Sequence, residues 1–174
     1  MWNIQTMDEF RRCISDLIAQ PDVQDMDHIC QHAGGVSCLD HCVFVSYLSF
    51  ALCRRWGLDY VAAARAGLLH DLYLCDWSAT TIGPWERLLI HPQMALHNAE
   101  IHGLSELEKD IISNHMWPIT LRRIPRHRES AVVNLADKLC ATAEMLRIYR
   151  LIGAGRRLVE YNFGKRRLIP DAVV

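Results

Sequence analysis

The sequence lacks a long uninterrupted apolar run, and this absence excludes a common class of membrane protein. A helix that crosses a bilayer needs about 20 predominantly apolar residues, and no such run occurs in the 174 residues. Residues 1–9 contain no basic stretch that leads into an apolar one, so the pattern of a secretory signal is also missing. We therefore expect a cytoplasmic protein that does not associate with a membrane.

An excess of charge and a pattern of paired cysteines are missing as well. The chain has 19 basic and 20 acidic side chains, so it carries no strong nucleic-acid signal. Its seven cysteines are odd in number and form no Cys-x-x-Cys pair, which argues for reduced, mostly buried thiols. The apolar fraction of 51% is enough to fill the core of one domain of this length.

What the sequence does contain is a series of helix signals, without the alternating polarity of a half-buried strand. Capping boxes are expected at Thr6, Ser37 and Ser105, and Pro92 is expected at the first position of a helix. The helices expected from these signals span about residues 7–20, 23–32, 38–56, 60–73, 92–102, 106–115 and 129–152. The predicted fold class is therefore all-α, as a single-domain helical bundle.

Six His and Asp side chains fall inside or at the ends of these apolar helices, where charged groups are rare unless they are paired or bind metal. Imidazole nitrogen and carboxylate oxygen suit Zn, Mn, Fe and similar divalent ions. Five separate segments supply the six groups, which exceed what one tetrahedral ion needs. The predicted ligands are His41, His70, Asp71, His91, His115 and Asp137.

Asp71 is the natural candidate to bridge two ions, because its two oxygens can each bind one ion of a pair about 3.5–4 Å apart. Asp137 lies in a helix whose neighbouring residues look buried, so its carboxylate needs a positive partner. The alternative is a core of hydrogen-bonded histidines with one buried ion pair, in which His115 caps a helix C-terminus. This alternative does not explain why all these residues fall at comparable helix positions.

The order His, His-Asp, His, His, Asp resembles the HD-domain superfamily of metal-dependent phosphohydrolases, and the chain is similar to small single-domain bacterial members. The local matches include Leu39-Asp40-His41, Leu68-Leu69-His70-Asp71-Leu72, His91-Pro92, His115-Met116-Trp117-Pro118 and Ala136-Asp137-Lys138. The resemblance implies one HD domain over residues 1–174. Its core spans about residues 30–150, with N-terminal helices over 1–29 and a C-terminal tail over 151–174, and the metal site lies between central helices.

In that family the first His, the His-Asp pair and the last Asp bind a metal, and two further histidines add a second ion in the binuclear branches. The resemblance therefore implies two divalent ions of Fe, Mn, Zn, Mg, Co or Ni. The first would be held by His41, His70, Asp71 and Asp137, and the second by His91 and His115. The chain lacks the Gly-Tyr-Pro and the paired histidines of the cyclic-dinucleotide branch, which argues against a cyclic-dinucleotide substrate.

The activity that the resemblance implies is hydrolysis of a phosphomonoester or phosphodiester by a metal-activated water, with Asp71 and Lys138 in catalysis. The expected partner is a small phosphorylated substrate, with a nucleotide as a candidate. Guanidinium groups match phosphate in a bidentate manner, so Arg65 and Arg126, together with His32, are predicted to bind the substrate. Two alternatives stay open, a di-iron oxygenase of the same fold and a non-catalytic sensor of metal and nucleotide. The sequence does not predict the oligomeric state.

Overall fold

A computed structural model describes residues 4–32, 36–75, 77 and 80–146 of the chain. The longer helices are α1 (Ile4–Ile18), α3 (Cys38–Trp56), α4 (Tyr60–Leu69), α5 (Pro84–Ala99), α6 (Glu106–Asn114) and α7 (Arg128–Met145). Shorter elements are α2 (Pro21–Asp25), the 3₁₀ turns η1 (Met26–His28) and η3 (Glu100–His102), and the strands β1 (Cys30–His32) and β2 (Val36–Ser37). The all-α prediction is confirmed, and the predicted tail over 151–174 lies outside the described residues.

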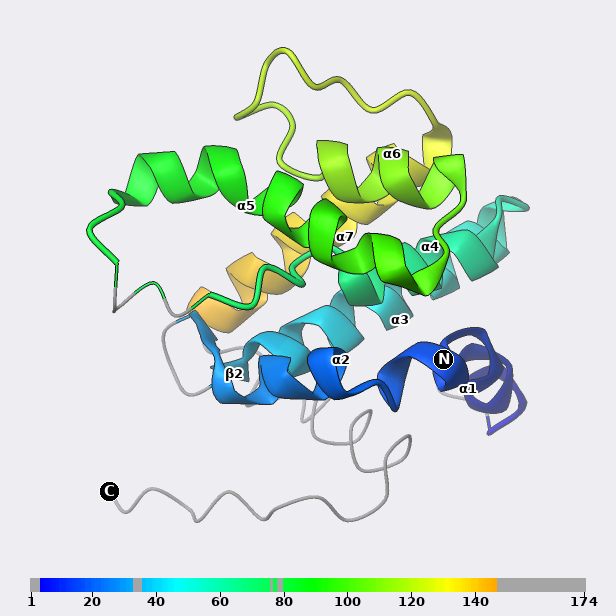
Figure 1. The fold of residues 1–174 in the computed structure, drawn as a ribbon. Helices are drawn as coiled ribbons and strands as arrows, with labels where there is room; N and C mark the ends of the chain where they lie inside the picture. The colour runs from blue at the N-terminus through cyan, green and yellow to red at the C-terminus, as the bar shows by residue number, and fades with distance from the viewer. Residues whose placement is uncertain (1–3, 33–35, 76, 78–79, 147–174) are drawn as a thin grey trace.

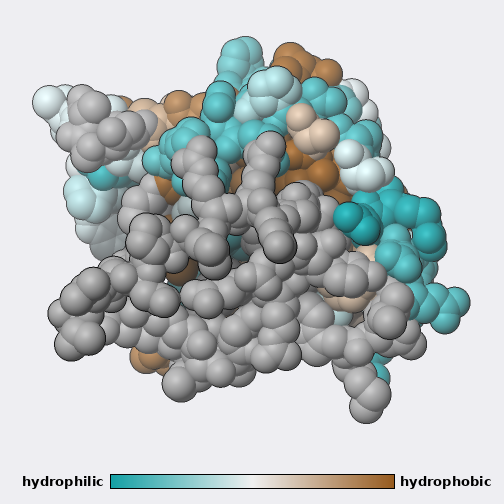
Figure 2. Space-filling view, turned by 90° about the horizontal axis from the view of Figure 1, so that it is seen from below, coloured by the Kyte–Doolittle hydropathy of each residue, from teal (hydrophilic) through white to brown (hydrophobic). Residues whose placement is uncertain are grey.

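The helices form a bundle with a central group. Figure 1 shows α1 and α2 along one side and α5 and α6 along the other, with α3, α4 and α7 between them. The buried apolar side chains of these helices form one cluster. Among the described residues no helix is both long and apolar enough to span a bilayer. Where the described surface is visible from below, it mixes hydrophilic and hydrophobic side chains (Figure 2).

Helix α3 has the bounds that its local sequence predicts. The Ser37 side chain accepts a hydrogen bond from the backbone N–H of Asp40 at 3.1 Å, and Gly57 ends the helix with a φ of 67°, which a glycine adopts without strain. Gly67 of α4 lets the two helices approach closely, since a Cβ there would lie 3.0 Å from the Cα of Ser46. This close packing places the start of α3 beside the end of α4.

Two N-terminal predictions are wrong. Thr6 lies inside α1, which already begins at Ile4, so it is not an N-cap. The helix expected over 23–32 is the short α2, followed by η1 and β1. Pro21 occupies the first position of α2, which its fixed φ favours. Strand β1 then pairs with β2 in an antiparallel hairpin, with Cys30 opposite Ser37.

The boundaries of α4 and α5 also differ from the prediction, and both differences affect the site. Helix α4 ends at Leu69 with His70 as its C-cap, so Asp71 lies just beyond the helix. Helix α5 begins at Pro84 rather than Pro92, and Pro92 lies in its interior. Both prolines suit a first helical position, and the structure uses the earlier one. His91 is therefore in the middle of α5 and not at its start.

Candidate metal centre

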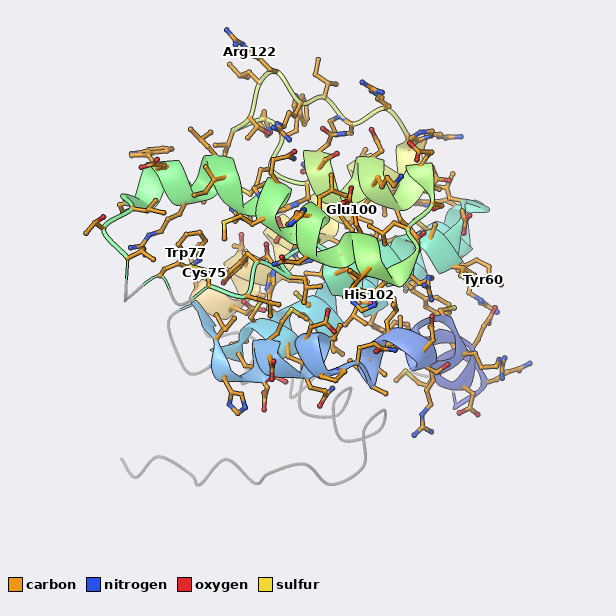
Figure 3. The ribbon with its side chains drawn as sticks, in the orientation of Figure 1. Tyr60, Cys75, Trp77, Glu100, His102 and Arg122 are labelled. Carbon is orange, nitrogen blue, oxygen red and sulfur yellow. The ribbon has the colours of Figure 1, made fainter. Side chains whose placement is uncertain are left out.

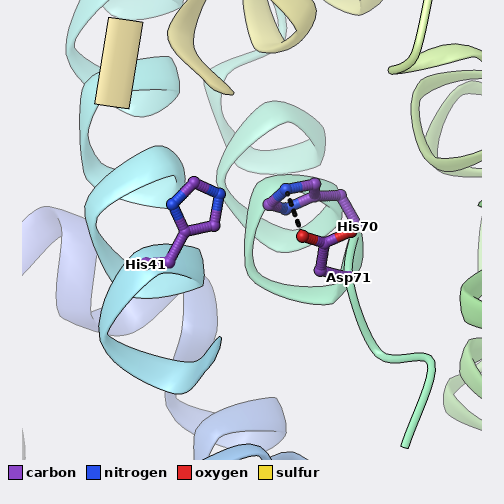
Figure 4. Close-up of side chains that lie close together, drawn as sticks. All are labelled: His41, His70 and Asp71. Carbon is purple, nitrogen blue, oxygen red and sulfur yellow. Dashed lines mark ion pairs between the residues drawn. The ribbon is translucent and has the colours of Figure 1, made fainter. Parts of the chain in front are cut away.

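The structure brings the six predicted ligands together in one buried cluster. His41 comes from the first turn of α3, and His70 and Asp71 from the end of α4 (Figure 4). The other three are His91 of α5, His115 at the C-cap of α6, and Asp137 of α7. All six residues are less than a tenth exposed. Segments separated by up to 96 residues therefore converge on a common space.

One half of the cluster lies between α3, α4 and α7. Ligand atoms of His41, His70 and Asp71 lie within 4.8 Å of one another. The Oδ1 atom of Asp137 adds a fourth group, 3.2 Å from Nε2 of His41 and 3.7 Å from Nε2 of His70. Two imidazoles and two carboxylates thus face each other over distances that a single cation can span.

The other half of the cluster lies toward α5 and α6 and shares Asp71. The Oδ1 atom of Asp71 is 3.4 Å from Nε2 of His91 and 3.6 Å from Nε2 of His115. Its Oδ2 atom is 3.5 Å from Nε2 of His70 in the first half. Asp71 therefore directs one oxygen to each half, which is the arrangement that a bridging carboxylate requires.

Three of the histidines have their Nδ1 atoms occupied by backbone carbonyl groups. The Nδ1 atoms of His70, His91 and His115 lie 2.9, 2.9 and 2.8 Å from the carbonyl oxygens of Gly67, Arg87 and Ile112, respectively. A carbonyl oxygen only accepts hydrogen bonds, so each Nδ1 carries the hydrogen and each Nε2 of a neutral ring presents a lone pair.

The three Nε2 lone pairs point into the space beside Asp71. Nε2 of His70 is buried and makes no hydrogen bond with any residue that the structure describes. The Nε2 atoms of His91 and His115 are 2.9 Å apart, where two lone pairs repel unless a cation or a proton lies between them. These observations fit a site for a divalent cation. Histidines that bind a metal through one ring nitrogen are commonly oriented by a hydrogen bond from the other nitrogen, as these three are.

Glu144 is a member of the centre that sequence reasoning missed. Nδ1 of His41 donates to its carboxylate, with distances of 2.9 Å to Oε1 and 3.1 Å to Oε2. Glu144 is 2% exposed and follows Asp137 by two turns of α7, so both acids lie on one face of that helix. This spacing is the signal that could have indicated its role, because a glutamate on a buried helix face needs a partner.

The electrostatics favour the protonation state that a metal needs at Asp71 and His115, whereas, despite burial, neighbouring carboxylates raise the pKa of His41 and of His70. Burial raises the pKa of Asp71, but the neighbouring His70 and His91 outweigh it and hold the pKa at about 2. Burial, with His70 and His91 nearby, lowers the pKa of His115 to about 3. Burial also opposes ionisation of His41, yet Asp137 and Glu144 raise its pKa, so a cation in that half competes with a proton.

Of the predicted catalytic and substrate-binding residues, Lys138 borders the centre. Its Nζ donates to the carbonyl oxygen of His115 at 2.8 Å and lies 3.4 Å from Oδ2 of Asp137. Its side chain is about one-third exposed, so the ammonium group stands where the cluster meets the surface. A role for Lys138 in catalysis stays a prediction.

Arg65 pairs with carboxylates of two other helices, and its role in substrate binding stays a prediction. Its Nε is 2.9 Å from Glu108, and its Nη1 is 2.7 Å from Asp16, so the guanidinium group links α4 to α6 and α1. Arg126 is exposed in the loop between α6 and α7 and is not part of the cluster. His32 ends β1, and its side chain lies outside the described part of the structure.

The sequence matches a protein-family model. The family model of the HD domain matches residues 38–142, a range that includes all six predicted ligands, and this match confirms the resemblance. No curated protein matches the sequence. Among solved structures, the chain is similar to the HD domain of the phosphodiesterase PgpH of L. monocytogenes. The TM-score is 0.47 and the identity 14%, over 91% of this chain and 89% of that one.

Proposed function

Because the chain belongs to the HD-domain family, we propose that it is a metal-dependent phosphohydrolase that acts on a small phosphorylated substrate. The observation that carries the proposal is the position of Asp71, which directs one oxygen to His70 and the other to His91 and His115. A bound divalent cation polarises a phosphoryl oxygen and lowers the pKa of water. The six side chains fit such a cation because they are buried, because hydrogen bonds orient the histidines, and because imidazole nitrogens and carboxylate oxygens offer lone pairs to a metal.

We assign the ligands to two ions, as the two halves of the cluster suggest. The first half offers His41, His70, Asp71 and Asp137, and the second offers Asp71, His91 and His115. A set of imidazoles and carboxylates accepts several first-row divalent metals, so the identity of the ions is left to measurement. The shared carboxylate of Asp71 supports a pair of ions rather than a single one.

The chain contributes mainly by positioning these groups. The carbonyl groups of Gly67, Arg87 and Ile112 fix three imidazoles, and the Glu144 carboxylate fixes His41. Such fixation reduces the reorganisation that the reaction requires. The ammonium group of Lys138 lies at the exposed edge of the cluster, where it is placed to balance the charge of a phosphate group.

The test combines metal analysis with hydrolysis assays on the full chain. The protein is purified without chelator, and release of nitrophenol from p-nitrophenyl phosphate and from bis(p-nitrophenyl) phosphate is followed with added Mn(II). We expect Asp71→Asn to lower both bound metal and the hydrolysis rate, the rate by at least about 100-fold. The matched control is Asp25→Asn, which changes an exposed aspartate of α2 and should behave as the wild type.

Two results would contradict the proposal. One is an Asp71→Asn variant that hydrolyses both esters at the wild-type rate. The other is a wild-type protein that binds Fe(II), consumes oxygen with a substrate and releases no product from either ester, which would favour the oxygenase.

A further inference from the structure

A second polar site lies outside the metal centre, in the loop that connects α6 to α7. A cavity of about 310 Å³ is lined there by Asn114, Arg122, Arg123, Ile124, Pro125 and Arg126. Three of the six lining residues are arginines, and none is acidic. Figure 3 shows Arg122 at the outer end of the loop, pointing away from the helices.

The arginines of this loop differ from Arg54 of α3 and Arg65 of α4 in their partners. Arg54 pairs with Glu9, and Arg65 pairs with Asp16 and Glu108. By contrast, no ion pair joins the guanidinium groups that line the cavity to any residue in the described part of the chain. Residues 116–128 contain four arginines and no acidic residue, in a chain whose total charge is −1. The loop is therefore a local concentration of uncompensated positive charge.

Asp110 of α6 connects the loop to the helices on either side of it. Its carboxylate accepts hydrogen bonds from Nδ2 of Asn114 at 2.8 Å, from the backbone N–H of Arg126 at 3.1 Å and from the hydroxyl group of Ser130 at 2.6 Å. The negative charge of Asp110 is thus shared among three donors. Because these bonds tie the end of α6, the end of the loop and the start of α7 together, the cavity is built before any ligand arrives.

At the C-terminal end of α6, the carbonyl group of the C-cap residue His115 is already hydrogen-bonded, so it is not a free acceptor that would oppose an anion. The carbonyl oxygen of His115 accepts hydrogen bonds from Nδ2 of Asn134 at 2.6 Å and from Nζ of Lys138 at 2.8 Å. These donors from α7 offset the partial negative charge that a helix C-terminus carries.

We propose that this cavity binds a phosphate group of a ligand. Guanidinium groups bind phosphate through paired, charge-assisted hydrogen bonds, and the cavity falls at the lower end of the volume range of small-molecule sites. Asn114 lines the cavity and is followed directly by His115 of the metal centre. The phosphate belongs either to a second group of the substrate, an assignment that rests on the proposed function, or to a separate phosphorylated effector.

Calorimetric titration of the full chain with inorganic phosphate tests the binding itself. The experiment compares the double variant Arg123→Ala/Arg126→Ala with the control Arg11→Ala/Arg12→Ala, which removes two exposed arginines of α1. We expect the first variant to weaken phosphate binding at least about tenfold, as the loss of two charge-assisted contacts predicts, and the control to change it less than about twofold. Equal weakening in both variants would overturn the proposal, because it would indicate attraction by general charge.

The variant Asp71→Asn distinguishes phosphate binding in the loop from phosphate binding at the metal centre. The loop cavity does not include Asp71, so phosphate binding should persist in that variant and should still depend on Arg123 and Arg126. Loss of all phosphate binding in Asp71→Asn would overturn the proposal, since the anion would then bind at the metal centre alone. Failure of the proposed hydrolysis, with phosphate binding retained in the loop, would refute only the proposed function.

Kinetics with two substrates then distinguish the two sources of the phosphate. If the loop holds a second phosphate of the substrate, Arg123→Ala/Arg126→Ala should raise KM about tenfold for a nucleoside diphosphate and leave KM for p-nitrophenyl phosphate unchanged. If it holds an effector, added inorganic phosphate should change the hydrolysis of p-nitrophenyl phosphate in the wild type and not in this variant. Either result supports a phosphate site in the loop.

Discussion

Two clusters of charged side chains link the helices of this bundle in different ways. In the first, Arg65 of α4 bridges Glu108 and Asp16, so the chain itself supplies a cation that both carboxylates contact. In the second, the carboxylates of Asp71 and Asp137 face imidazoles of four helices or helix ends. The first cluster therefore contains its own cation, whereas the imidazoles and carboxylates of the second fit the divalent metal that HD domains bind.

Removal of metal should have the largest effect, and it should affect the metal centre without affecting the Arg65 cluster. Treatment with a chelator is expected to abolish hydrolysis and to lower the stability by about 3 kcal/mol if the metal had been present at 100 times its dissociation constant. The Arg65 cluster needs no metal, so the helical content should remain. Circular dichroism melts and assays before and after addition of Mn(II) measure both effects. Full activity in protein shown to be metal-free would contradict this expectation.

Arg65→Ala should lower the stability of the protein and leave its metal content unchanged. It leaves Glu108, which is 5% exposed, without its guanidinium partner, although Ser105 still donates to that carboxylate at 2.7 Å. We expect a loss of about 2 kcal/mol in the free energy of unfolding, below the value for a fully buried pair, and an unchanged metal content. Denaturant titration and metal analysis test the two halves of this prediction. A variant of normal stability that cannot bind phosphate esters would instead support the predicted role of Arg65 in substrate binding.

Glu144→Gln should weaken metal binding without unfolding the protein. The amide keeps the shape of the side chain but loses the charge that orients His41, and loss of such an outer partner costs about 10–100-fold in metal affinity. Competition with a metal-sensitive dye gives the affinity, and the melting temperature of the metal-free variant reports its fold. Glu106→Gln, at an exposed side chain of α6, is the matched control. Equal affinities for the two variants would show that His41 needs no carboxylate partner.

The smallest effect is expected for Asp16→Asn. The Asp16 side chain is 59% exposed, and exposed ion pairs contribute at most about 1 kcal/mol. Arg65 would keep its buried partner Glu108, so the variant should lose less stability than Arg65→Ala and retain full activity. Denaturant titration of the two variants side by side decides this order. A larger loss for Asp16→Asn would mean that the link to α1, and not the link to α6, stabilises the cluster.

The fold and the six clustered residues could be predicted because their signals are local. Ser37 and Gly57 define α3 through contacts within a few residues of each helix end. Histidines and aspartates in apolar helices stand out because burial of such groups is costly without a partner. The order of these residues along the chain then resembled a known family, although sequence alone did not establish their distances.

The rest depends on contacts between distant segments. Glu144 resembles any helix glutamate in sequence, and its partner His41 is 103 residues away. The ion pairs of Arg65 could not be predicted for the same reason, since its partners lie 43 and 49 residues away. The start of α5 was misplaced because Pro84 and Pro92 give the same local signal, and packing decides between them.

Anomalous diffraction from crystals of the full chain grown with Mn(II) tests the central claim most directly. Two peaks are predicted, one among His41, His70 and Asp137 and the other beside His91 and His115, with the Asp71 carboxylate in contact with both. A map without a peak next to Asp71 would contradict the account, because the buried carboxylates and imidazoles would then balance one another without a cation.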